Sequence, residues 1–290
     1  MMNGPTSHNF ISQRLRLHYV TWGDPANEPL IFVHGIRDHN RTWDLILSEF
    51  ADDYFIIAPD LRGHGESEWV NGSGYHYLDY VYDLFQLINQ LGLHQVTLIG
   101  HSLGGAIVTL FAGVYPERVA RLIAIEGIGL WSRSQLQVPA HEKIRGWVDA
   151  NQQLASRRPR RYPDLDTAAV RMQEANPQLA EHQARHLTQY GVLQHEDGTF
   201  SWKYDNYTNN FLSSFGLTDA HTIDLWRNIQ CPVLLINAAE GLPHRIGHEE
   251  TLEYFAEVEL IDIQAAGHWT YYDQPDQVVG AMLNFLRPKD

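Results

Sequence analysis

The sequence predicts an α/β fold in which an open, mostly parallel sheet is flanked by helices. Short continuous apolar runs recur along the chain, and such runs are typical of strands covered on both faces of a parallel sheet. Segments with apolar residues at helical spacing lie between them. With 290 residues, 44% of them hydrophobic, the chain exceeds a typical domain of about 100–200 residues and can bury a large core.

Predicted strands and helices alternate in the first third of the chain. Residues 15–19 alternate between apolar and more polar side chains, which indicates a half-exposed strand. Apolar spacing over residues 84–91 indicates a helix that ends at Gly92, and a second helix is expected over residues 103–115. Continuous apolar runs predict buried strands at residues 30–33, 55–58, 96–99 and 122–125.

The pattern changes in the segment 128–228, which is rich in Arg, Gln, His, Trp and Tyr. No buried β-run occurs there, and helix-like stretches are found at residues 166–174 and 178–188. Asp197-Gly198 is a typical turn sequence for a short hairpin between Val192 and Lys203. This segment is therefore predicted to be a mostly helical insertion.

The α/β pattern resumes after the insertion. Buried strands are expected at residues 233–236 and 258–263, and an amphipathic final helix at residues 278–286. We therefore predict one discontinuous α/β core. It comprises residues 1–127 and 229–290, and the insertion of residues 128–228 interrupts it.

The charge balance limits the kinds of partner. The chain carries 21 basic and 35 acidic residues, a net charge of −14, which opposes binding to nucleic acid or to an anionic membrane surface. The insertion holds equal numbers of basic and acidic residues, so this charge falls on the core. We expect a small-molecule partner and no nucleic acid.

The cysteine content and the first residues of the chain indicate the expected cellular compartment. Cys231 is the only cysteine, which excludes an intrachain disulfide and fits a reducing compartment. The first twenty residues lack the apolar region of a secretion signal, and no apolar stretch approaches about 18 residues. We therefore expect a cytoplasmic protein without a membrane span.

The strongest functional signal is Gly100-His101-Ser102-Leu103-Gly104-Gly105, a G-x-S-x-G sequence directly after a predicted strand and directly before a predicted helix. A sharp strand-to-helix turn at this point would expose the serine hydroxyl above the carboxyl edge of the sheet. Small residues are needed there because side chains would block the turn. Ser102 is therefore predicted to be a nucleophile.

A serine nucleophile needs a base and a pair of oxyanion donors. His268 is the candidate base, since it lies just beyond the predicted strand 258–263 and before the final helix. The backbone N–H groups of Ile36 and Leu103 are the candidate oxyanion donors, because Gly35 lets the chain turn after the strand 30–33 and Leu103 follows the nucleophile.

These segments resemble the α/β-hydrolase fold superfamily. Residues 59–67, PDLRGHGES, resemble the loop after its fourth strand, and Gly267-His268 resembles its histidine loop. His34-Gly35-x-x-Asp38, followed by Thr42-Trp43, is similar to the branch that holds serine hydrolase-like proteins, epoxide hydrolases and haloalkane dehalogenases. The last two use an aspartate nucleophile where this chain has Ser102, so the resemblance does not imply their activities.

The resemblance leaves two candidates for the acid that orients the histidine. Most of the superfamily places it where this chain has Glu240, whereas some dehalogenase-like members place it where this chain has Glu126. Both glutamates follow buried strands at the carboxyl edge of the sheet. Ile236-Asn237-Ala238 resembles the dehalogenase-like branch, which favours Glu126 and keeps Glu240 as the alternative.

The resemblance also assigns the insertion to a cap over the nucleophile that shapes the substrate pocket. Five residues are candidates to line this pocket: His34, Arg37, His101, Trp131 and Trp269. We expect His34 to hold the turn that it begins as well.

These observations predict a serine hydrolase that cleaves small to medium carboxylic esters, without a metal or an organic cofactor. The same residues serve other chemistry in the superfamily, so hydrolysis of C–C, thioester or amide bonds and perhydrolysis stay open, as does a non-catalytic ligand-binding role. The sequence does not decide whether the protein is a homodimer.

Overall fold

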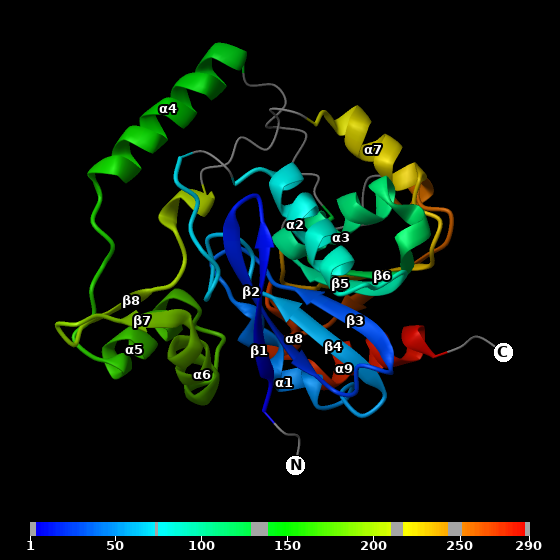
Figure 1. Ribbon diagram of the computed structural model, residues 1–290, viewed down its shortest axis with the longest axis horizontal. Helices are drawn as coiled ribbons and strands as arrows, with labels where there is room; N and C mark the ends of the chain where they lie inside the picture. Colours follow the sequence, from blue (N-terminus) through cyan, green and yellow to red (C-terminus); the bar gives the residue numbers. More distant parts are fainter. Residues whose placement is uncertain (1–3, 73–74, 129–138, 210–216, 243–250, 288–290) are drawn as a thin grey trace.

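An eight-stranded sheet forms the centre of the molecule (Figure 1). The computed structural model describes residues 4–72, 75–128, 139–209, 217–242 and 251–287. The strand order is β1-β2-β4-β3-β5-β6-β9-β10, with β2 antiparallel to β1 and β4 and the other pairs parallel. The strands are β1 (Thr6–Ser12), β2 (Leu15–Trp22), β3 (Glu28–Val33), β4 (Tyr54–Pro59), β5 (Val96–His101), β6 (Val119–Ile125), β9 (Val233–Ala238) and β10 (Val258–Ile263). The predicted fold class is confirmed.

Helices cover both faces of the sheet, as Figure 1 shows. The alternation of side chains along β3 explains why both faces are apolar: Ile31 and Val33 belong to one core cluster, and Leu30 and Phe32 belong to the other. The first cluster includes α2 (Tyr77–Gln90), α3 (Leu103–Val114) and α7 (Asp219–Arg227). The second includes α1 (Asp44–Leu47), α8 (Thr270–Asp273) and α9 (Pro275–Leu286).

Two elements differ from the sequence prediction at the ends of the chain. β1 is an additional edge strand that pairs with β2 over seven residues, and its polar sequence TSHNFIS lacks the apolar run of a buried strand. The final helix begins at Pro275 rather than at residue 278, because proline is well suited to the first turn of a helix. Short 3₁₀ helices connect other elements at Asn40–Trp43, Pro116–Arg118, Asn206–Asn209 and Thr251–Tyr254.

Much of the insertion lies to one side of the sheet, at the left of Figure 1. It contains α4 (Ala140–Ser156), α5 (Leu165–Ala175), α6 (Glu181–Gly191) and the predicted hairpin of β7 (Val192–Gln194) and β8 (Phe200–Trp202). α7 also falls within residues 128–228, yet it packs on α3. Trp226 of this helix is buried in the core, and the Asn228 side chain that follows donates to the Gly113 carbonyl at 2.8 Å.

None of the helices in the described ranges combines the length and the apolar character needed to cross a bilayer.

A buried ion pair fixes the loop after β4 to α2. The Arg62 guanidinium, 1% exposed, donates to both carboxylate oxygens of Asp83 at 2.7 Å. Burial raises the pKa of Asp83 even with the arginine beside it. Removing the arginine would therefore leave an uncompensated buried carboxyl group.

We expect Arg62→Ala to lower the free energy of unfolding by about 3–5 kcal/mol, because a buried charge would lose its partner. Urea denaturation followed by circular dichroism would measure this loss. Arg16→Ala, which breaks the exposed pair with Glu68, is the matched control and should have little effect. Equal losses in the two variants would contradict the prediction.

Candidate active site

Ser102 occupies a strained turn between β5 and α3. Its backbone has φ 53° and ψ −114°, a region that residues with a side chain rarely adopt. The Ser102 N–H donates to the Ile125 carbonyl at 2.9 Å, which ties the turn to the end of β6. A Cβ atom on Gly104 would come within 2.6 Å of the His34 carbonyl oxygen, so the chain needs glycine there. The predicted strand–turn–helix is present.

Glu126 and His268 lie in contact at the same edge of the sheet. His268 Nδ1 is 3.3 Å from Glu126 Oε2. The Glu126 carboxylate also accepts backbone N–H groups from Ala238 at 2.6 Å and from Leu242 at 3.0 Å. Glu126 is buried, with 4% of its surface exposed. Its three partners fix the side chain and orient Oε2 toward the histidine ring.

The alternative carboxylate lies differently. Glu240 is exposed, and its backbone N–H donates to the Ala266 carbonyl at 2.9 Å. The structure thus brings Glu126, and not Glu240, to His268. Among the described residues no hydrogen bond joins the Ser102 hydroxyl group to the His268 ring; such bonds often form only when substrate is bound.

The loop after β3 approaches the nucleophile closely. A Cβ atom on Gly35 would lie 3.3 Å from Ser102 Cβ and 3.1 Å from His101 Nδ1, so glycine permits this approach. The next residue is Ile36. Leu103 opens α3, and its N–H is one of those that a helix leaves without an intrahelical partner. Both candidate oxyanion donors therefore lie on segments that meet at Ser102.

Backbone strain is concentrated at this edge of the sheet. Arg37, Ser102, Glu126 and Ala265 all have φ between 53° and 58°, each in a loop that follows a parallel strand. Such conformations cost about 1–3 kcal/mol each and persist where the surrounding structure enforces them. Their clustering makes this edge of the sheet the candidate functional site.

The comparisons with known proteins agree with this fold. The alpha/beta hydrolase fold family model matches residues 28–275. The chain belongs to this family. It is similar to a serine hydrolase-like protein of Danio rerio, at 24% identity over 92% of this chain and 84% of the relative. It is also similar to a 3-hydroxybutyrate-oligomer hydrolase of Cupriavidus necator, at 27% identity over 91% of this chain and 90% of the relative.

A solved structure shares the fold of this alpha/beta hydrolase over almost its whole length. The thioesterase domain from the curacin biosynthetic pathway superposes with a TM-score of 0.83 at 22% identity, covering 97% of this chain and 100% of the domain. At this identity the likeness bears on the fold alone.

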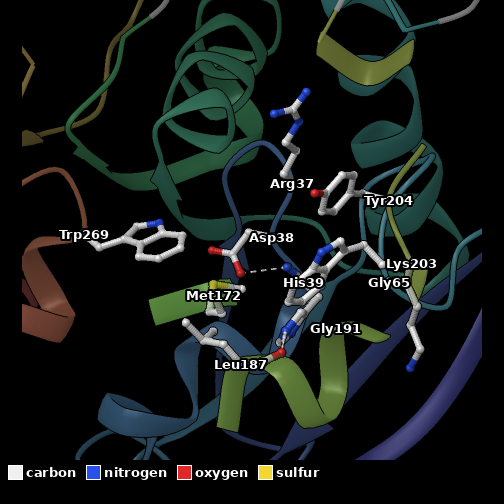
Figure 2. A pocket seen from close by; sticks show the side chains of 11 residues that line it. Arg37, Asp38, His39, Gly65, Met172, Leu187, Gly191, Lys203, Tyr204 and Trp269 are labelled. Atoms are coloured by element: carbon white, nitrogen blue, oxygen red, sulfur yellow. Dashed lines mark hydrogen bonds between the residues drawn. The ribbon is translucent and has the colours of Figure 1, made fainter. Parts of the chain in front are cut away.

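A pocket of this alpha/beta hydrolase lies between the core and the insertion (Figure 2). Of the five residues predicted to line it, Arg37 and Trp269 do so. Trp131 lies outside the described residues. His34 and His101 are not among its lining residues, and the contact of these five residues with a substrate stays a prediction.

The two buried histidines hold the site together instead. His34 Nδ1 donates to the Gly35 carbonyl at 2.7 Å and its Nε2 accepts from the Leu61 N–H at 3.0 Å, so it holds its turn as expected. His101 Nε2 donates to the His268 carbonyl at 2.8 Å. Burial lowers the pKa of both rings, so each stays neutral and supports a neighbouring loop.

The insertion also contacts the core through polar groups near the pocket. His39 Nε2 donates to the Leu187 carbonyl at 2.9 Å, and His186 Nε2 donates to the Arg41 carbonyl at 3.1 Å. His182 and His186 lie four residues apart on α6, a spacing that can hold zinc. No group of three or more metal-ligating side chains lies together among the described residues.

Proposed function

We propose that the protein is a serine hydrolase that cleaves carboxylic esters of small to medium size through an acyl-enzyme at Ser102. The observation that carries the proposal is the strained Ser102 turn beside the Glu126–His268 contact. A serine with a purely structural role does not need a positive φ. At a nucleophile, the strained turn presents the hydroxyl group to the substrate.

The residues have distinct roles in the proposed reaction. Ser102 Oγ attacks the ester carbonyl carbon while His268 Nε2 takes the hydroxyl proton, and the N–H groups of Ile36 and Leu103 stabilise the oxyanion. The intermediate then collapses, the C–O bond to the alcohol breaks and His268 returns the proton to that alcohol. Glu126 accepts from His268 Nδ1–H, which keeps Nε2 free to act as the base.

Water completes the cycle. His268 takes a proton from a water molecule as the water oxygen attacks the acyl-enzyme carbonyl carbon. The second intermediate then collapses, the C–O bond to Ser102 breaks, and His268 returns the proton to Ser102 Oγ as the carboxylic acid leaves. The names of the two relatives, a serine hydrolase-like protein and a hydrolase of 3-hydroxybutyrate oligomers, support hydrolysis over other chemistry of the family. The aromatic walls contributed by Trp202 and Trp269 favour an enclosed substrate.

A fluorophosphonate probe tests the proposal. The Ser102 oxygen is expected to displace fluoride from phosphorus, giving one label per chain that mass spectrometry assigns to the Ser102 peptide. Hydrolysis of p-nitrophenyl butanoate should fall in proportion to labelling, because both depend on one nucleophile. The acetate and butanoate esters should be cleaved faster than the laurate.

Heat-denatured protein is the control, since it keeps the serine and loses the turn. Labelling at another residue, or ester hydrolysis that persists in fully labelled protein, would refute the proposal. An unlabelled and inactive protein would favour the ligand-binding alternative.

A further inference from the structure

The pocket adjoins the candidate catalytic residues through two loops. Its wall includes Arg37, Asp38 and His39, which follow directly on Ile36, and Trp269, which follows His268. Met172 of α5 and other cap residues close the opposite side (Figure 2). The loops that carry the candidate oxyanion donor Ile36 and the candidate base His268 therefore also form part of the pocket wall.

His39, a residue of the pocket wall, carries a buried acceptor. Its Nε2 donates to the Leu187 carbonyl at 2.9 Å, which leaves Nδ1 as a lone-pair acceptor on a neutral ring. Burial lowers the pKa of His39 to about 4, so the ring stays neutral near pH 7. Nδ1 has no hydrogen-bond partner within the described part of the chain. A buried acceptor without a partner costs free energy that a suitable donor would recover.

A second unpartnered polar atom belongs to the neighbouring residue. The Asp38 side chain is 4% exposed, and one oxygen accepts the His39 N–H at 2.9 Å. Its other oxygen, Oδ2, lacks a hydrogen-bond partner among the residues described. Burial raises the pKa of Asp38 to about 7, and the Thr42 and Tyr271 hydroxyl groups, which bond to each other at 3.2 Å, only partly offset the rise.

The charged side chains near the pocket are engaged elsewhere. Lys203 forms an ion pair with Glu66, and its ammonium group donates to the Tyr190 carbonyl at 2.9 Å. The Arg37 guanidinium lies 5.6 Å from the centre of the Tyr204 ring and points away from the Asp38 carboxyl group in Figure 2. Asp38 and His39 are therefore the wall residues that carry buried polar side-chain atoms without a hydrogen-bond partner in the described part of the chain.

We propose that Asp38 and His39 form a hydroxyl-binding subsite, so that the preferred substrates are esters that carry a free hydroxyl group. A hydroxyl group can donate to His39 Nδ1 while its oxygen accepts from protonated Asp38, and a neutral group suits apolar walls. The inference rests on the proposed ester hydrolysis and adds the substrate class. The hydroxyl group belongs to either the acyl or the alcohol part of the ester.

Three matched esters test the subsite: ethyl butanoate, ethyl 3-hydroxybutanoate and 2-hydroxyethyl butanoate. Base uptake in a pH-stat gives kcat/KM for each. We expect one of the hydroxylated esters to exceed ethyl butanoate by about tenfold or more, since each satisfied buried hydrogen bond is worth about a factor of ten. The ester that gains identifies the part of the substrate that enters the pocket.

Variants assign the preference to the two side chains. In Asp38→Leu and His39→Phe the ratio between the preferred and the plain ester should fall toward one, whereas Asp38→Asn keeps a donor and should keep most of the ratio. Met172→Leu, elsewhere in the same pocket, is the control and should change both esters alike.

The outcomes separate this inference from the proposed function. If p-nitrophenyl butanoate and all three esters are untouched, ester hydrolysis itself fails. If ethyl butanoate is cleaved as fast as both hydroxylated esters, the subsite binds only water and the inference is overturned. A preference that survives both Asp38→Leu and His39→Phe would overturn it as well.

Discussion

Ser102→Ala is expected to lower kcat for p-nitrophenyl butanoate by about 10⁶-fold, because loss of a serine nucleophile removes the acyl-enzyme route. The His268 base would then have no hydroxyl proton to take, and only weak catalysis by the oxyanion donors would remain. Stopped assays with concentrated enzyme would measure the residual rate. Because Ser102 lies at the N-terminus of α3 without a side-chain hydrogen bond to the helix, the fold should survive.

Two further variants sharpen this test. Ser102→Gly should be equally inactive, and it adopts the φ of 53° without strain, so a loss in both variants is not due to a distorted turn. Ser48→Ala, at an exposed serine after α1, should keep full activity. A Ser102→Ala variant within tenfold of the unchanged protein would exclude Ser102 as the nucleophile.

The sequence was sufficient to predict the fold and the nucleophile because both depend on local patterns. The continuous apolar runs of β3 to β6 report burial on both faces, and the turn at Ser102 needs glycine at positions four residues apart. β1 was missed because an edge strand with one exposed face carries few apolar residues. β1 forms by pairing with β2, and the periodicity of its own sequence does not reveal this pairing.

The acid and the pocket depend on contacts between distant segments. Glu126 and Glu240 follow adjacent strands with the same local sequence pattern. Glu126 differs in its positive φ and in the hydrogen bonds that its carboxylate accepts from the N–H groups of Ala238 and Leu242, more than a hundred residues away in the sequence. Asp38 was visible as part of a motif. The contact of His39 with α6, and the pocket that Asp38 and His39 line together, follow only from how the insertion packs.

Glu126→Gln is expected to lower kcat by about 10⁴-fold, as is typical when the acid that orients a catalytic histidine becomes an amide. The carboxylate accepts from three donors, His268 Nδ1–H and two backbone N–H groups, whereas an amide offers one acceptor oxygen and an NH₂ group. The NH₂ group must therefore face a donor. When it faces His268, it favours the tautomer that places the proton on Nε2 and disables the base.

Glu240→Gln is the matched control, since it makes the same chemical change on an exposed side chain after the neighbouring strand. It should leave kcat within about twofold, because surface substitutions away from the site have small effects. Thermal melts of both variants separate catalysis from unfolding. A large loss in Glu240→Gln with a nearly active Glu126→Gln would transfer the role of the acid to Glu240. That result would require the 240–242 loop to move, because Glu126 already occupies the place beside His268.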